Sequence, residues 1–344
     1  MKERSVWPLV ITMALPMVIS MLVNSLYNIV DSYFVAKVSE DAIAAISLVF
    51  PLQNLANAVG IGFGVGINAA VAYYLGSGNR NAADRSAALG LILSAVHGLI
   101  LAAACAACIE PFLKLFTSKE SILTYGLEYF YTVIAFSPAF TLSMGFEKIL
   151  QAVGKMKTTM FCMAIGAVAN IILDPIFISG LGPIPAMGVF GAALATGIGQ
   201  VLSLLSYIAV FFFANIPVKL RIGRAGEEKI CKKLYLVGIP AALNLALPSF
   251  MITALNAILS NFSETYVLIL GVYYKLQTFI YFTVSGIVQG IRPLVGYNLG
   301  AGLNDRIKKI FGVTLILGLA VMLIGTVLCL AIPNDLMGLF TDNP

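Results

Sequence analysis

Two aspartates interrupt long apolar stretches of the chain, and each has a polar neighbour at helical spacing. Asp31 lies in "SLYNIVDSYFV" and Asp174 lies in "ANIILDPIFI". Tyr27 precedes Asp31 by four residues and Asn170 precedes Asp174 by four, a spacing that places both members of each pair on one face of a helix. Carboxylates grouped with hydroxyl and amide oxygens can bind a hard cation or share a proton. The pattern therefore predicts a site for Na⁺ or H⁺.

The surrounding sequence predicts an integral membrane protein. Of its 344 residues, 60% are hydrophobic and 11% are charged, whereas a soluble domain carries about 25% charged residues. The mean hydropathy is +0.95. The apolar residues form blocks long enough to cross a bilayer as helices. We therefore expect an all-α polytopic membrane protein with no enzymatic activity.

The two aspartates are expected at similar depths in the membrane. An ionised side chain at the bilayer centre costs roughly 2.5–3.5 kcal/mol, so such residues persist mainly where they face a cavity or a partner. At about 1.5 Å per helical residue, both lie roughly 6–9 Å below the outer boundary. The alternative is that each aspartate simply ends its span near the headgroups. The matched depths and matched polar neighbours favour a shared pocket.

Apolar runs between charged or Gly/Pro punctuation predict membrane spans. The second and eighth are expected to be broken or tilted, because "GIGFGVG" and "SGIVQGIRP" are rich in glycine. Glu147, near the end of the fourth span, is expected at the membrane interface, and Lys148 is assigned to the inner side. The nine predicted spans are 8–34, 43–74, 86–109, 121–145, 159–180, 187–213, 234–260, 264–290 and 311–332.

The distribution of lysine and arginine predicts the orientation, because positively charged segments stay in the cytoplasm. Of the 21 Lys and Arg residues, 17 fall on the side of the N-terminus, and one, Lys275, falls within a span. The three on the other side are Lys37, Lys114 and Lys119. We therefore expect a multi-pass protein of the inner (plasma) cell membrane with a cytoplasmic N-terminus. Its net charge of +5 reflects this orientation, and no nucleic-acid partner is expected.

An internal repeat relates the two parts of the chain. At an offset of 224 residues, 60–78 aligns with 284–302 with 8 of 19 positions identical, and Gln53 aligns with Gln277. Because six spans separate the copies, the repeat is parallel, and such halves usually enclose a cavity at the membrane midplane. The expected domains are an N-lobe over 1–218 (spans one to six), a cytoplasmic linker over 219–233 and a partial C-lobe over 234–344 (spans seven to nine). Three spans of the second copy are expected to be missing. The predicted substrate cavity is lined by Gln53, Lys275, Gln277 and Asn24.

The segments "LPMVISMLVNSLYNIVDSYFVAK" and "AVANIILDPIFI", the "GSG" and "GAG" turns and the repeat together resemble multidrug and toxic compound extrusion (MATE) transporters. The resemblance implies two six-helix lobes that form a V around a central cavity. It also implies export of amphipathic, often cationic drugs in exchange for H⁺ or Na⁺, without a cofactor, by a monomer surrounded by membrane lipid. The cation site that it implies consists of Asp31, Tyr27, Asn170, Asp174 and Thr196, with Asp31, Asp174 and Asn170 as the metal ligands if the ion is Na⁺.

Three alternatives stay open. A flippase for lipid-linked precursors would need a strongly cationic cavity, for which only Lys275 and Arg292 offer charge. An intramembrane aspartyl protease could use two membrane aspartates that share a proton, but it would need a G-x-G-D element, which neither "IVDSY" nor "ILDPI" contains. An inert fragment of a transporter would explain the missing spans.

Overall fold

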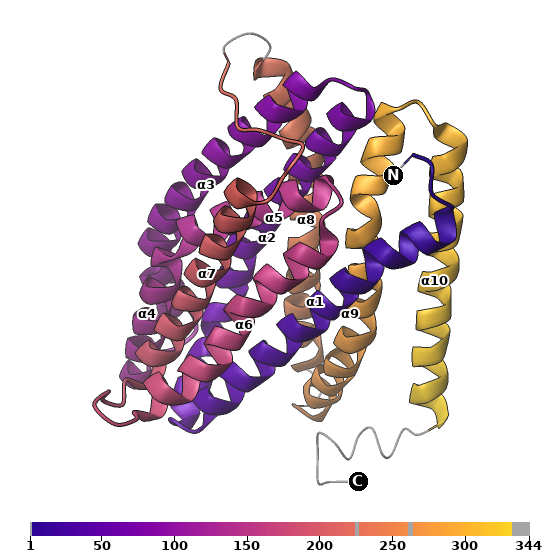
Figure 1. Ribbon diagram of the computed structural model, residues 1–344. Helices are drawn as coiled ribbons and strands as arrows, with labels where there is room; N and C mark the ends of the chain where they lie inside the picture. The colour runs from indigo at the N-terminus through magenta and orange to yellow at the C-terminus, as the bar shows by residue number, and fades with distance from the viewer. Residues whose placement is uncertain (1, 224–226, 261–263, 332–344) are drawn as a thin grey trace.

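The computed structural model describes residues 2–223, 227–260 and 264–331, and every regular element within them is a helix (Figure 1). Most of the helices are long and antiparallel to their sequence neighbours. A short loop with one isolated bridge, between Leu181 and Ile184, precedes α7. The helices are α1 (Val6–Ala36), α2 (Glu40–Gly76), α3 (Arg80–Lys114), α4 (Glu120–Ala135), α5 (Ser137–Ala152), α6 (Met156–Ser179), α7 (Gly188–Phe213), α8 (Glu227–Ser260), α9 (Glu264–Gly300) and α10 (Asn304–Ala331).

The helices confirm a polytopic membrane fold. Seven helices in the described part of the chain are long and apolar enough to cross a membrane, and α4 and α5 make an eighth span if they are counted together. The count of nine stays a prediction. So does the domain division, although residues 227–233 of the expected linker belong to helix α8.

The second span is not broken, because α2 is one continuous helix from Glu40 to Gly76; that it is tilted stays a prediction. Helix α9, which contains the other glycine-rich stretch, is also continuous. The break lies in the fourth span instead, where α4 and α5 meet at Phe136 and differ in direction by 45°. Pro138 lies at the start of α5, and proline suits the first turn of a helix because it has no N–H to donate. The glycines of α2 serve another purpose, which is close packing between helices.

The helix bounds follow the repeat. Adding 224 to both ends of α2 (Glu40–Gly76) gives both ends of α9 (Glu264–Gly300). Helix α3 begins at Arg80 and α10 begins at Asn304, which is the same offset. The two glycine-rich stretches therefore occupy equivalent places in equivalent helices.

Pairs of glycines join the two copies with approximate twofold symmetry. A Cβ on Gly76 would overlap the backbone of Tyr297, and a Cβ on Gly300 would overlap the backbone of Tyr73. These two contacts exchange under the offset of 224, as contacts across a twofold axis must. A second reciprocal set joins Gly62 to Ala242 and Gly286 to Val18. We call this surface the glycine seam; it lies in the half of the bundle nearer the N-terminus, at the top of Figure 1.

Helix α1 connects the candidate site to the second copy. It crosses the bundle obliquely (Figure 1) and packs against both α6 and α9. Asp31 lies five residues before the end of α1 at Ala36, and Asp174 lies five before the end of α6 at Ser179. Both ends are far from the N-terminus (Figure 1). The depth match that the sequence predicts is therefore present in the helices.

Candidate cation site

Asn170 and Asp174 form the buried centre of the candidate site. Asn170 is 2% exposed and Asp174 is fully buried. The Asn170 amide nitrogen donates to Asp174 Oδ1 at 3.3 Å and lies 3.3 Å from Thr196 Oγ1 on α7. The four-residue spacing on α6 thus produces the contact that the sequence predicts, and α7 adds the threonine.

Helix α1 carries Asp31 and Tyr27, the other two residues predicted for cation coupling. Asp31 lies near enough to Asp174 for the two carboxylates to interact electrostatically, and Tyr27 lies within electrostatic range of both. Asn170, Asp174 and Thr196 are therefore in contact, Tyr27 lines the same cavity as Asn170 and Thr196, and the place of Asp31 in the site stays a prediction.

Three buried oxygens in this cluster have no hydrogen-bond partner among the described residues. They are Asp31 Oδ1, Asn170 Oδ1 and Asp174 Oδ2. Buried polar atoms are almost always paired, since leaving one unpaired costs about 1–3 kcal/mol. All three atoms are acceptors, so each can accept a hydrogen bond or coordinate a cation. Oxygen donors of this kind suit Na⁺ or H⁺, whereas softer metals prefer sulfur and imidazole. No group of three His, Cys, Asp or Glu side chains gathers anywhere in the described chain.

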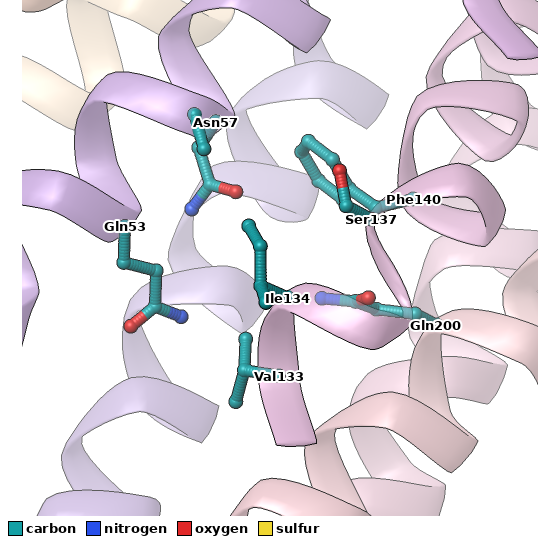
Figure 2. Close-up of a pocket in the computed structure, with 8 residues that line it drawn as sticks. Gln53, Asn57, Val133, Ile134, Ser137, Phe140 and Gln200 are labelled. Atoms are coloured by element: carbon teal, nitrogen blue, oxygen red, sulfur yellow. The ribbon is translucent and has the colours of Figure 1, made fainter. Parts of the chain in front are cut away.

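The residues predicted for a substrate cavity do not share one pocket. Asn24 lines a cavity of about 100 Å³ that also reaches Tyr27, Asn170 and Thr196. Gln53 lines a smaller adjoining pocket with Asn57 and Gln200 (Figure 2), and Gln200 lines both. Gln277 lies on α9 with an exposed side chain. The side chain of Lys275 lies outside the part of the chain that the structure describes.

Glu147 and Lys148 lie inside the bundle, so the expectation of Glu147 at the membrane interface is wrong. They are 6% and 3% exposed. Lys148 Nζ lies 2.7 Å from Glu147 Oε1, and Gln151 Nε2 donates to the same oxygen at 2.6 Å. Each charge is therefore compensated, as buried charges must be. Adjacent opposite charges followed by a glutamine one turn later were the available sequence signal.

This buried ion pair also reaches the second copy of the repeat. Lys148 Nζ donates to Gln289 Oε1 on α9 at 3.0 Å. The Lys148 side chain passes so close to α2 that a Cβ on Gly64 would lie 2.9 Å from it. The backbone carbonyl of Lys148 accepts a hydrogen bond from Asn68 at 3.1 Å. Lys148, which lies on α5, thus has contacts with two further helices, α2 and α9.

A membrane bundle built from a parallel repeat, with buried carboxylates between its helices, has the architecture of a secondary transporter. The MatE family model matches residues 16–176 and 240–344. The chain therefore belongs to the MatE family, and it is a MATE-type efflux transporter and a multi-pass protein of the cell membrane.

Named relatives cover nearly the whole chain. The FAD transporter of Shewanella oneidensis is 27% identical to it, over 97% of this chain and 74% of the relative. The multidrug export protein MepA of Staphylococcus haemolyticus is 26% identical, over 100% of this chain and 75% of the relative. The chain thus spans about three quarters of the length of both.

Solved structures show the same fold. A MOP superfamily transporter from Pyrococcus furiosus, described as having a binding pocket of reversed polarity, aligns with a TM-score of 0.92 at 23% identity, over 99% of this chain and 75% of its own. A MATE family multidrug resistance transporter in an outward-facing conformation aligns equally well, at 24% identity and the same coverage.

Proposed function

We propose that this chain exports amphipathic or cationic compounds in exchange for H⁺ or Na⁺. The ion binds at the cluster of Asp31, Asp174, Asn170, Tyr27 and Thr196. The observation that carries the proposal is the set of three buried acceptor oxygens without partners, contributed by α1 and α6. They form an oxygen pocket that a cation or a proton would complete.

Coupling follows from competition between the ion and the substrate. The N-terminus lies in the cytoplasm in this proposal, so the cluster faces the outer half of the membrane. An entering ion neutralises Asp31 and Asp174 and lets α1 pack more closely against α6. Helix α1 contains Pro16, and proline is a common cause of helix bends because it removes a backbone hydrogen bond. Since α1 also packs on α9, a bend changes the contact between the two lobes.

Substrate binding from the cytoplasmic side favours the ionised cluster. Each ligand thus shifts the equilibrium towards the state that it binds better. One elementary charge moved across 100 mV is worth about 2.3 kcal/mol, before any concentration gradient is counted. The transporter works as a monomer in membrane lipid, with the coupling ion as its only small inorganic ligand.

The test replaces each carboxylate by its amide in the purified chain, reconstituted in proteoliposomes. Asp174→Asn and Asp31→Asn each remove a charge-assisted interaction worth about 1.5–3 kcal/mol, so ion-driven ethidium transport should fall by about 10–150-fold. The matched control is Asp305→Asn, because Asp305 is an exposed aspartate on α10. If both cluster variants transported ethidium at the rate of the unmodified chain, the coupling role would be wrong.

FAD is a second candidate substrate, since one relative is named for it. Transport assays in the same proteoliposomes distinguish FAD from amphipathic or cationic compounds as the substrate. Transport of FAD in place of ethidium, with equal dependence on Asp174, would keep the ion site and replace the substrate.

A further inference from the structure

The cavity of about 100 Å³ that reaches Asn170 leads from the candidate cation site towards the other end of the bundle. At one end it reaches Asn170 and Thr196, and at the other it reaches Glu147 and Tyr207. Along α7 its lining runs from Thr196 to Tyr207, which is about 16 Å at about 1.5 Å per residue. The cavity is lined by residues of α1, α5, α6 and α7, and all four helices lie in the first copy of the repeat.

A polar stripe on α7 follows the cavity from end to end. Between two apolar flanks, the residues at i, i+4, i+7 and i+11 all carry polar side chains that line the cavity, and this spacing keeps them on one face of the helix. They are Thr196, Gln200, Ser203 and Tyr207. Helix α5 adds Ser143 opposite. Gln200 Oε1 is buried and has no hydrogen-bond partner in the described chain, so the middle of the cavity offers a free acceptor.

The inner end of the cavity is closed by Tyr207 and Glu147. The Tyr207 hydroxyl lies 3.4 Å from Glu147 Oε2 and 3.2 Å from the backbone carbonyl of Thr159. Thr159 is three residues from the start of α6 at Met156, so this closure lies close to the N-terminal end of the bundle. Tyr207 is 1% exposed. Tyr207 therefore lines this end of the cavity and packs in a buried apolar cluster with Leu150 and Phe211.

Glu147 is the one carboxylate in the lining of this cavity. Its Oε1 faces Lys148 and Gln151 on its own helix, and its Oε2 faces Tyr207 on α7. Cys162 on α6 is within electrostatic range, and Lys148 in turn contacts Gln289 on α9. Because Oε1 has two partners and Oε2 only a long contact, Oε2 is the oxygen that can receive a proton or a cation.

We infer that this cavity is the route by which the coupling ion leaves the acidic cluster for the N-terminal end of the bundle, with Glu147 as the receiving carboxylate and Tyr207 as the gate. The inference rests on the proposed function. For H⁺, Asp174 gives up its proton along the polar stripe, Glu147 Oε2 accepts it and then releases it, and both carboxylates end ionised. For Na⁺, the ion passes between the same oxygens. The ion therefore leaves through the first lobe, separately from the space between the lobes.

The first test measures whether water reaches the middle of the cavity. In a chain with all five cysteines replaced, Ser203→Cys places a thiol on the polar stripe, and Leu205→Cys places one on the same helix at a residue that is 55% exposed. A charged methanethiosulfonate reagent reacts in water and not in lipid. Ser203→Cys should react about ten-fold faster than Leu205→Cys, because the thiol at residue 205 faces lipid. A ten-fold ratio of rates corresponds to a difference of about 1.4 kcal/mol in the free energy of reaching the thiol from water. Equal or slower reaction at Ser203→Cys would overturn the route.

The second test follows the ion itself. Glu147→Gln keeps the hydrogen-bonding shape but cannot hold a proton and has no negative charge to attract a cation, so release of H⁺ or ²²Na⁺ to the N-terminal side should slow by about ten-fold or more. Ethidium binding and ion uptake from the opposite side should stay unchanged, which a loss of fold would not allow. The control is Glu128→Gln, an exposed glutamate on α4. Tyr207→Phe should raise ion leak in the absence of substrate, because the gate hydroxyl is gone.

The outcomes separate the route from the function. If Asp174→Asn abolishes coupling and Glu147→Gln releases ions at the normal rate, the route is wrong and the proposed antiport stands. If neither change matters, the antiport itself is wrong. If the thiol at Ser203→Cys blocks ethidium binding and leaves ion release intact, the cavity is a substrate site and the route is overturned. If Glu147→Gln fails to fold, the route is tested by the reaction rate of the thiol in Ser203→Cys and by the ion leak in Tyr207→Phe.

Discussion

Asn170 has one amide nitrogen that serves two acceptors from different helices. It donates to Asp174 Oδ1 on its own helix and approaches Thr196 Oγ1 on α7, both at 3.3 Å. This arrangement leaves the Asn170 carbonyl oxygen directed away from both partners, and that oxygen is one of the three without a partner. In the proposed cation site, Thr196 orients Asn170 so that the Asn170 oxygen is available to the ion.

Thr196→Val tests this orienting role, because valine keeps the shape of threonine and removes its hydroxyl. One hydrogen bond contributes about 1 kcal/mol, so the concentration of Na⁺ or H⁺ that half-saturates transport should rise about five-fold. The maximal rate should change little, because both carboxylates remain. Thr196→Ser keeps the hydroxyl and should behave like the unmodified chain. An unchanged half-saturating concentration in Thr196→Val would show that Asn170 needs no partner on α7.

For individual residues, the sequence predicts contacts between side chains on one helix but not contacts between side chains on different helices. The spacing of Asn170 and Asp174 predicts their contact, because helix geometry alone sets it. The burial of Glu147 is different: it depends on α7, whose Tyr207 approaches Glu147, and on α9, whose Gln289 approaches its neighbour Lys148. No local pattern encodes which helix will cover a residue, so Glu147 was expected at the membrane interface.

The glycines of α2 let two helices approach until their backbones touch. A Cβ on Gly66 would overlap the backbone carbonyl of Leu234 on α8. Small residues at helix contacts are the usual means of close packing in membranes, where there is little hydrophobic drive to bring helices together. The same glycines predict a broken or tilted span from the sequence, because glycine both weakens helices and permits close contact. Only the neighbouring helix shows which of the two effects applies.

Gly66→Leu should force the two lobes apart at the N-terminal end. Overpacking typically costs about 1–3 kcal/mol, which shifts a two-state population by about 5–150-fold. Spin labels at Asn81 and Asn304, exposed residues at that end of the two copies, should report a longer distance. The control is Gly312→Leu, because a Cβ at Gly312 on α10 meets nothing within 4 Å. An unchanged distance in Gly66→Leu would mean that the close contact between Gly66 on α2 and Leu234 on α8 does not hold the lobes together.

The two copies of the repeat have similar helices, but their polar residues differ. The offset of 224 residues relates both the helix bounds and the contacts of the glycine seam, and the sequence alone predicts this repeat because identical residues mark it. The acidic cluster does not obey the symmetry: the position equivalent to Asp31 is Leu255. A symmetric scaffold therefore carries the proposed ion site in one half, and α1 joins that site to the other half through α9.

The number of carboxylates in that single site sets the charge moved in each transport cycle. Asp31 and Asp174 can together hold two positive charges, so exchange for one monovalent cationic dye carries one net charge inward per cycle. A potential of 100 mV is then worth about 2.3 kcal/mol, which corresponds to about a fifty-fold change in the dye ratio at equilibrium. The measurement is ethidium accumulation in proteoliposomes whose potential is set by a potassium gradient and valinomycin. Asp31→Asn, if it retains residual transport, should remove the response to potential but not the response to the ion gradient. Accumulation that is independent of potential in the unmodified chain would instead show that the two carboxylates hold a single shared charge.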